Sequence, residues 1–359
     1  MIDYVDPAVA VIGPTTWGTA LAILLARKGL SVCLVARTDE EADRLARSRQ
    51  NSRRLPGIAF PDTLHIGTLA SERVKAAGVL LLAVPSQTVR ENLRAALPYL
   101  SDHLLLINAG KGLELGTNKR MSEVIAEEAP PHLAGRVCVL SGPNLSKEMV
   151  AGKPASAVVA SPRIDAAVWA QKILMGPTFR IYTSTDVVGV ELGGALKNVI
   201  ALGAGICDGL GYGDNARAAL ITRGLAEITR LGHALGANPL TFAGLAGLGD
   251  LVATCSSQLS RNHQVGVKLA QGIPLSEIFK TMHEVAEGVN TTVAARALAA
   301  QTGVEMPITE QMYRVLFEGH DPLRAVTELM ARDPKEENAD FTRNDSPQRH
   351  SEGTLKSSC

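Results

Sequence analysis

The first half of the chain alternates short apolar runs with longer segments in which apolar residues recur every three or four positions. Helical periodicity fills most of these longer segments, as in residues 19–28 (T-A-L-A-I-L-L-A-R-K), which stop at Gly29. The apolar runs have the length and composition of buried strands. They lie at 8–12, 32–35, 79–84, 104–107, 137–140 and 155–160. The alternation predicts an α/β domain, a Rossmann-like doubly wound parallel sheet with helices on both faces.

The character of the chain changes near residue 189, after which helical patterns separated by glycine loops continue without a strand signal. We therefore expect an NAD(P)-binding Rossmann domain over 1–188 and an all-helical substrate-binding domain over 189–332. In the long helix that ends near residue 235, Arg223 and Glu227 have the spacing of an i,i+4 ion pair. From residue 333 to 359 the sequence is polar and aperiodic, which predicts a disordered tail.

The turn after the first predicted strand reads Gly13-Pro14-Thr15-Thr16-Trp17-Gly18 and leads into a helix. A strand, a glycine turn, a helix and a second strand within about thirty residues are the context of a dinucleotide site. The motif G-x-G-x-x-G would need glycine where this chain has Thr15, so a plain strand–turn–helix remains an alternative. Arg37 closes the second strand, where an arginine suits a 2′-phosphate and an acidic residue would suit the ribose of NAD. This favours NADP(H) and leaves NAD(H) open.

Polar residues follow the ends of three further predicted strands, at 85–86, 108–112 and 141–144. In open α/β sheets, ligands bind beyond the carboxyl ends of the strands. These loops are therefore candidates for the floor of a pocket. Lys111 lies between two glycines and could reach an anion, although an ordinary turn lysine would look the same.

Isolated charges in apolar surroundings mark the helical half. Lys197 is the single charge between Glu191 and Asp208, and on a helix it shares its face with glycines that leave room for another backbone or a small ligand. Burial there would lower the pKa of this lysine toward neutrality. Asn198 adds an amide beside it. Asp250 similarly ends a glycine-rich apolar run, and a buried structural ion pair is the alternative to a functional site for both charges.

The composition sets limits on partners and location. The chain has 36 basic and 36 acidic residues, so no general field favours nucleic acid or an anionic membrane. The five cysteines are scattered without a C-x-x-C pair, which suits reduced thiols better than disulfides or a metal. The N-terminus lacks the pattern of a signal peptide, and no stretch is predicted to cross a membrane. We expect a cytoplasmic protein.

Several ordered blocks carry a resemblance to a known family. They are G-P-T-T-W-G-T-A-L-A at 13–22, N-A-G-K-G-L at 108–113, L-S-G-P-N-L-S-K-E at 140–148, G-V-E-L-G-G-A-L-K-N-V-I-A at 189–201, N-A-R-A-A-L-I-T-R-G-L at 215–225, G-L-G-D-L-V-A-T-C at 247–255, S-R-N at 260–262, E-G-V-N-T at 287–291 and V-E-M-P-I-T at 304–309. From about residue 9 to 332 the chain thus resembles the bacterial NAD(P)-dependent glycerol-3-phosphate dehydrogenases. It departs from them at Thr15, at Asn144, where threonine or serine is common, and in the tail.

The resemblance implies reversible reduction of dihydroxyacetone phosphate to sn-glycerol 3-phosphate, which supplies glycerophospholipid synthesis. It implies that Lys197 is the general acid, and that Lys111, Asn198 and Asp250 hold the substrate and tune this lysine. The implied substrate contacts are Lys111, Gly142, Asn144, Lys197, Asp250, Ser260, Arg261 and Asn262. The cofactor positions are Gly13, Thr16, Trp17, Gly18, Arg37, Lys111, Ser146, Arg261, Val285 and Glu287. No metal is implied, and a homodimer is left open.

Two other functions compete with this one. A dehydrogenase of the same two-domain build could act on a hydroxy acid or a sugar acid, but it would not explain Ser260-Arg261-Asn262 in addition to Lys111. A cofactor sensor or scaffold could keep the fold without turnover, and Thr15 is its only support. Oxidation of NADPH with dihydroxyacetone phosphate and with other ketones separates the three.

Overall fold

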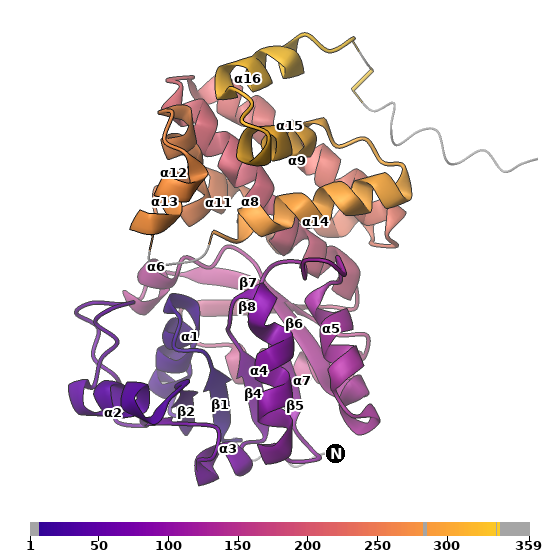
Figure 1. Ribbon diagram of the computed structural model, residues 1–359. Helices are drawn as coiled ribbons and strands as arrows, with labels where there is room; N and C mark the ends of the chain where they lie inside the picture. The colour runs from indigo at the N-terminus through magenta and orange to yellow at the C-terminus, as the bar shows by residue number, and fades with distance from the viewer. Residues whose placement is uncertain (1–6, 283–285, 335, 338–359) are drawn as a thin grey trace, which may run out of the picture.

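The computed structural model describes residues 7–282, 286–334 and 336–337. A sheet with its flanking helices forms one end of the molecule, and a group of helices forms the other (Figure 1). The predicted cofactor residue Val285 and nearly all of the predicted tail lie outside the described residues.

The sheet has eight strands within the described residues, in the order β3-β2-β1-β4-β5-β6-β7-β8. The strands are β1 (Val9–Ile12), β2 (Val32–Val35), β3 (Leu64–Gly67), β4 (Val79–Leu82), β5 (Leu105–Asn108), β6 (Val137–Ser141), β7 (Ala155–Ala160) and β8 (Phe179–Ser184), with β3 and β8 at the edges. Along β1, Val9 and Val11 face one core, and Ala10 and Ile12 face the other. Burial on both faces explains why the predicted runs are continuously apolar.

The sheet is parallel, as predicted, except that β7 pairs antiparallel with β6. The helix between them, α6 (Ser146–Val150), has five residues and spans about 8 Å. It is too short to carry the chain back along a strand of this sheet, so β7 returns in the opposite direction. The edge strands β3 and β8 were not predicted, because each is only partly buried and breaks the apolar pattern.

Helices cover both faces of the sheet, as predicted. They are α1 (Thr16–Arg27), α2 (Asp39–Ser48), α3 (Glu72–Lys75), α4 (Val89–Ala96), α5 (Met121–Glu128), α6 and α7 (Ile164–Leu174), with short 3₁₀ turns η1 (Ser86–Thr88), η2 (Leu97–Tyr99) and η3 (Pro131–Arg136). The core beneath α1 and α7 lies on one face, and the core beneath α4 and α5 lies on the other.

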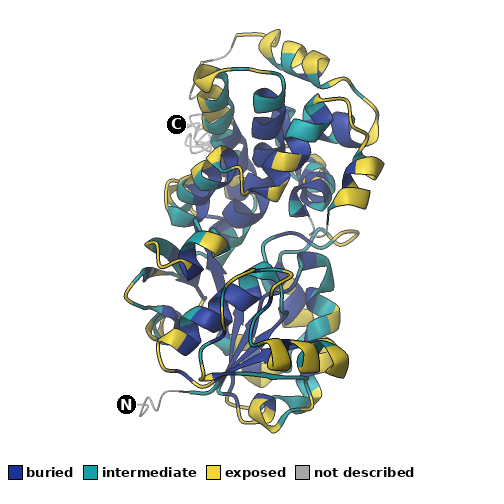
Figure 2. Cartoon of the chain, turned by 90° about the vertical axis from the view of Figure 1, so that its left-hand side faces the viewer, coloured by how far each residue is buried: buried dark blue, intermediate teal, exposed yellow. Residues whose placement is uncertain are grey.

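The helical part is organised around α8 (Val187–Gly209), which packs against α9, α11, α12 and α14. The other members are α9 (Asp214–Ala234), α10 (Pro239–Phe242), the π-helix η4 (Leu245–Gly249), α11 (Asp250–Ser256), α12 (Arg261–Ala270), α13 (Leu275–Thr281), α14 (Glu287–Thr302), α15 (Pro307–Phe317) and α16 (Pro322–Met330). Buried residues concentrate where these helices meet (Figure 2). Two segments, α8 and 239–256, are apolar enough to cross a membrane, but 83% of the apolar window of α8 is buried in the protein, and the second segment is broken into three short helices.

Candidate active site

Small residues on α8 let two other segments approach Lys197 closely. A Cβ atom on Gly193 would lie 2.6 Å from the carbonyl oxygen of Ala246, and one on Gly194 would lie 2.4 Å from Oγ of Ser141. Any side chain at these positions would therefore push η4 or the end of β6 away from α8. The expected approach of another backbone is present, and it places Lys197 where the sheet and the helical part meet.

Lys197, Asp250 and Lys111 form a buried cluster of charges. One carboxylate oxygen of Asp250 accepts a short hydrogen bond from Nζ of Lys197, and the other lies 2.8 Å from Nζ of Lys111. The exposed fractions are 7% for Lys197 and 2% for Asp250. Nζ of Lys111 also donates to the carbonyl oxygen of Gly142 at 2.8 Å. The expected ion-pair partner of the isolated lysine is thus the isolated aspartate, and the cluster has one excess positive charge.

The surroundings of Lys197 favour its neutral form. Burial lowers the pKa of Lys197 to about 8, and the charge of Lys111 acts in the same direction, whereas Asp250 opposes both. The lysine can therefore lose and regain a proton near neutral pH, as a general acid–base group must. A buried lysine that served only to pair with Asp250 would not need a second cation beside it.

Thr254 belongs to this cluster and was not singled out from the sequence. Its Oγ1 accepts a hydrogen bond of 2.7 Å from Lys197 and donates one of 2.7 Å to the carbonyl oxygen of Asp250, one helical turn earlier. The signal was its spacing of four residues from Asp250, which places both side chains on the same face of α11. The hydroxyl limits the rotation of the Lys197 ammonium and directs its remaining proton.

Two asparagines join three helices next to the charge cluster. Nδ2 of Asn262 donates to Oδ1 of Asn198 at 2.9 Å, and Oδ1 of Asn262 accepts from the backbone N of Gly288 at 2.9 Å. Ser260 caps α12 by accepting from the backbone N of His263 at 3.3 Å. The structure therefore brings Asn198, Ser260 and Asn262 together, with Arg261 at the first position of α12.

The loop after β6 presents polar atoms without protein partners. Gly142 has a φ of +142°, and a Cβ atom there would lie 2.8 Å from Cα of Ala157. Only glycine fits this turn without strain. Oγ of Ser141 and both side-chain polar atoms of Asn144 are buried and form no hydrogen bond within the described residues. Buried polar atoms usually have partners, so these atoms favour a bound polar ligand.

Five of the predicted cofactor residues, Gly13, Thr16, Trp17, Gly18 and Arg37, lie at or just after the carboxyl ends of β1 and β2. Gly13 has a φ of +103°, and a Cβ atom on Gly18 would lie 2.1 Å from the carbonyl oxygen of Gly13. Thr15 has an extended backbone and caps α1 by accepting from the backbone N of Gly18 at 3.0 Å. Its hydroxyl donates to the carbonyl oxygen of Ala83 at 2.8 Å. The threonine therefore fits this turn without needing the conformational freedom of glycine.

This turn fits the pyrophosphate of a dinucleotide. The first turn of α1, which Thr16 opens, carries no acidic residue, so nothing opposes an anion at the helix N-terminus. Nε1 of Trp17 is buried and has no hydrogen-bond partner among the described residues. Arg37 is exposed just beyond β2, and Ser146 is the first residue of α6. Within the described residues, neither Arg37 nor Ser146 shares a hydrogen bond with the Lys197 cluster. The residues expected to bind the dinucleotide at the ends of β1 and β2, together with Ser146, are called the nucleotide group below and are distinct from that cluster.

Glu287 connects the two parts of the molecule. Its carboxylate accepts hydrogen bonds from the backbone N and Oγ of Ser86, at 3.0 and 2.5 Å. Burial raises the pKa of Glu287. Ser86 lies after β4 and Glu287 begins α14, so this contact fixes the first turn of α14 against the edge of the sheet where the nucleotide group lies.

The fold and the site together define a two-domain dehydrogenase that uses a nicotinamide dinucleotide. The chain matches the family described as NAD-dependent glycerol-3-phosphate dehydrogenase over residues 8–167 for its N-terminus and 186–327 for its C-terminus. The chain belongs to this family, whose members are oxidoreductases acting on CH–OH groups.

Individual relatives agree with this assignment. The chain is 52% identical to a glycerol-3-phosphate dehydrogenase [NAD(P)+] of Dehalococcoides mccartyi over 324 residues, which cover 90% of each chain. A protein of the same name from Geobacter metallireducens is 52% identical over 329 residues, or 92% of this chain and 98% of that one.

Solved structures give the same result. The glycerol-3-phosphate dehydrogenase of Coxiella burnetii has a TM-score of 0.85 and 38% identity, covering 91% of this chain and 99% of the other. A D-mandelate dehydrogenase, at 13% identity and a TM-score of 0.57, shares the fold alone. The predicted fold class and family are confirmed.

Proposed function

We propose that this chain catalyses the reversible reduction of dihydroxyacetone phosphate to sn-glycerol 3-phosphate, with NADP(H) preferred over NAD(H). The observation that carries the proposal is the buried cluster of Lys197, Asp250 and Lys111 between the nucleotide group and α12. Two ammonium groups share one carboxylate there, so a neutral substrate would leave the cluster with an excess positive charge. A phosphorylated ketone offers both an anion and a carbonyl oxygen that becomes negative during reduction.

Lys197 is the proposed general acid. The bound nicotinamide supplies the hydride, and the ketone oxygen then gains negative charge. A protonated Lys197 within hydrogen-bond reach donates its proton to that oxygen, and the neutral amine takes a proton from the alcohol in the reverse direction. Asp250 and Thr254 keep the ammonium directed by accepting two of its hydrogen bonds, and Asn198 lies one residue further along α8.

The phosphate group is proposed to bind at the N-terminus of α12. Arg261 begins this helix, whose backbone N–H groups and dipole favour an anion. Asn262 and Ser260 lie on either side of it, and Lys111 approaches from the sheet. Gly142 and Asn144 complete the proposed substrate contacts, since the amide of Asn144 has no protein partner.

The dinucleotide is proposed to lie along the carboxyl ends of β1 and β2. Gly13, Thr16 and Gly18 would hold the pyrophosphate, and Arg37 would meet the 2′-phosphate. The remaining proposed contacts of the dinucleotide are Trp17, Lys111, Ser146, Arg261, Val285 and Glu287. We assign the nucleotide to residues 1–188 and most of the substrate contacts to residues 189–332. A cytoplasmic location, supply of glycerol phosphate to glycerophospholipid synthesis and a homodimeric assembly belong to the same proposal.

A steady-state assay of NADPH oxidation tests the proposal. We expect turnover with dihydroxyacetone phosphate and much less with unphosphorylated dihydroxyacetone or 2-oxo acids. Lys197→Met should lower kcat by about a hundredfold or more, the scale of a lost general acid, while NADPH binding changes little. Lys75→Met, which removes an exposed lysine from α3, is the matched control and should keep full activity.

Three results would contradict the proposal. Faster turnover of a 2-oxo acid would indicate a hydroxy-acid dehydrogenase. NADPH binding without turnover of any ketone would support the sensor hypothesis. A near-normal kcat in Lys197→Met would show that this lysine is not the general acid.

A further inference from the structure

The loop that carries Lys111 has little regular structure of its own. It connects β5 to α5 over residues 109–120, and its internal hydrogen bonds lie in the part from Leu113 to Arg120, which a bridge between these two residues closes. Lys111 nevertheless has to place its ammonium 2.8 Å from Asp250, which belongs to another part of the molecule. Contacts outside the loop must therefore fix its position.

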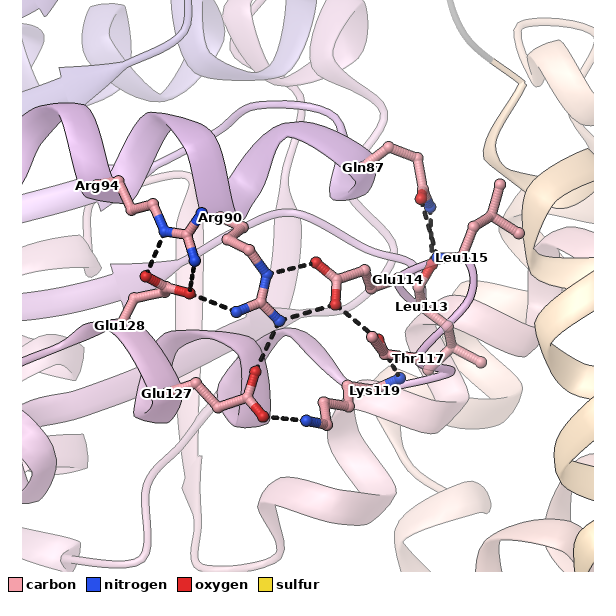
Figure 3. A network of polar contacts seen from close by, with 10 residues as sticks. All are labelled: Gln87, Arg90, Arg94, Leu113, Glu114, Leu115, Thr117, Lys119, Glu127 and Glu128. Carbon is pink, nitrogen blue, oxygen red and sulfur yellow. Dashed lines mark hydrogen bonds and ion pairs between the residues drawn. The ribbon is translucent and has the colours of Figure 1, made fainter.

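The side-chain amide of Gln87 binds the loop at Leu113 and Leu115. Nε2 of Gln87 donates to the carbonyl oxygen of Leu113 at 2.7 Å, and Oε1 accepts from the backbone N of Leu115 at 3.0 Å (Figure 3). One side chain thus binds backbone groups on both sides of Glu114. Nε2 of Gln87 also lies 3.2 Å from Oγ of Ser86, the residue that binds Glu287.

Arg90, one turn after Gln87, binds the loop through Glu114. Its Nε and Nη2 donate to the two carboxylate oxygens of Glu114, each at 2.8 Å. Nη2 also donates to Glu127 at 2.7 Å, and Nη1 bonds to Glu128 (Figure 3). Both of these glutamates end α5, so the guanidinium joins α4, the loop and α5.

This network differs from an ordinary surface ion pair. Three cations, Arg90, Arg94 and Lys119, balance three carboxylates, Glu114, Glu127 and Glu128. The exposed fractions of the central side chains are 21% for Arg90 and 15% for Glu114. The hydrogen bond from Arg90 lowers the pKa of Glu114 to about 2, so the pair stays charged at neutral pH. An arginine that binds a carboxylate through two hydrogen bonds fixes the relative orientation of the two groups and also pairs their charges.

We propose that Gln87 and Arg90 are positioning residues that fix the loop over residues 109–120 and thereby place the Lys111 ammonium on the substrate side of Asp250. This inference rests on the substrate-binding role proposed above for Lys111. A displacement of about 1 Å at a reacting group can lower the rate about a hundredfold. Loss of the contact made by Gln87 or Arg90 would therefore lower the rate by displacing Lys111 through the loop backbone.

The test compares two arginines on the same helix. Arg90→Met removes the contact with Glu114, whereas Arg94→Met removes an arginine whose hydrogen bonds go to Glu128 and not to the loop. We expect Arg90→Met to lower kcat/KM for dihydroxyacetone phosphate by about 10- to 100-fold, on the scale of a small misplacement, and Arg94→Met to change it less than about twofold. The Kd for NADPH should stay within about twofold in Arg94→Met. Gln87→Ala, a variant that keeps all charges, should act like Arg90→Met.

Combination with Lys111→Ala separates positioning from general stability. If Arg90 acts through Lys111, Arg90→Met should lower kcat/KM no further in the Lys111→Ala background. Two independent effects would multiply instead. Circular dichroism at the assay temperature would establish that each variant is folded.

Two outcomes overturn the inference. Wild-type kcat/KM in both Arg90→Met and Gln87→Ala would contradict it, and so would losses that multiply with the loss in Lys111→Ala. If Lys111→Ala itself kept full activity, the proposed role of Lys111 would fail first. That result is distinct from one in which Lys111 matters but its anchors do not.

Discussion

Asp250→Asn should destabilise the protein strongly, because this carboxylate is the shared partner of two buried ammonium groups. It is 2% exposed, contacts Nζ of Lys197 and lies 2.8 Å from Nζ of Lys111. Removing one partner of a buried ion pair typically costs about 3–5 kcal/mol, since the other charge is left uncompensated. We therefore expect a loss of this size in the free energy of unfolding. Asp165→Asn, which breaks an exposed pair with Arg163, should leave the free energy of unfolding nearly unchanged.

A double variant tests the reasoning behind this magnitude. Adding Lys111→Met to Asp250→Asn removes a cation as well as the anion, so the double variant should be more stable than the sum of the two single losses predicts. A coupling energy of about 1–3 kcal/mol is expected for residues in direct contact. Urea titrations at pH 7, followed by circular dichroism, measure all four proteins. Wild-type stability of Asp250→Asn, or strict additivity in the double variant, would refute the account of the cluster.

Two further substitutions test the nucleotide group. Arg37→Ala should weaken NADPH binding more than NADH binding, by about 1.5–3 kcal/mol for a charge-assisted contact, and equal losses in fluorescence titrations would point to stacking on adenine instead. Thr15→Gly should lower the unfolding free energy by about 1 kcal/mol, because it removes the cap of α1 and the hydrogen bond to Ala83. The affinity for NADPH should stay unchanged or fall modestly, and tenfold tighter binding by the glycine variant would show that Thr15 obstructs the site.

The fold could be predicted from the sequence wherever burial produces a local pattern of apolar residues. Strands such as β1 and β4 are buried on both faces and therefore appear as continuous apolar runs. The edge strand β8 alternates exposed and buried residues, with Arg180 among the exposed ones, and gave no such signal. The reversal of β7 depends on the short helix before it and on its partner in the sheet, and neither can be read from the residues of β7.

The site was partly visible for a different reason. Lys197 and Asp250 stood out because each is an isolated charge in an apolar run, but their pairing could not be predicted because they are 53 positions apart in the sequence. Glu227 shows the same limit, because its expected pairing with Arg223 is wrong. Its carboxylate instead accepts hydrogen bonds from the backbone N atoms of Ile308 and Thr309, and burial raises its pKa to about 7. Local spacing predicts contacts within one helix, whereas tertiary packing decides between those contacts and distant ones.

The pH dependence of the two reaction directions shows whether Lys197 is the acid–base group. Burial lowers the pKa of Lys197 to about 8, so the ammonium needed for reduction is lost above that pH and the amine needed for oxidation is gained. The kcat/KM for reduction of dihydroxyacetone phosphate should fall above about pH 8, approaching about tenfold per pH unit well above the pKa, and kcat/KM for oxidation of sn-glycerol 3-phosphate should rise through the same region. Rates that stay flat from pH 7 to 9.5 in both directions, or that fall together, would contradict the assignment of Lys197 as the acid–base group.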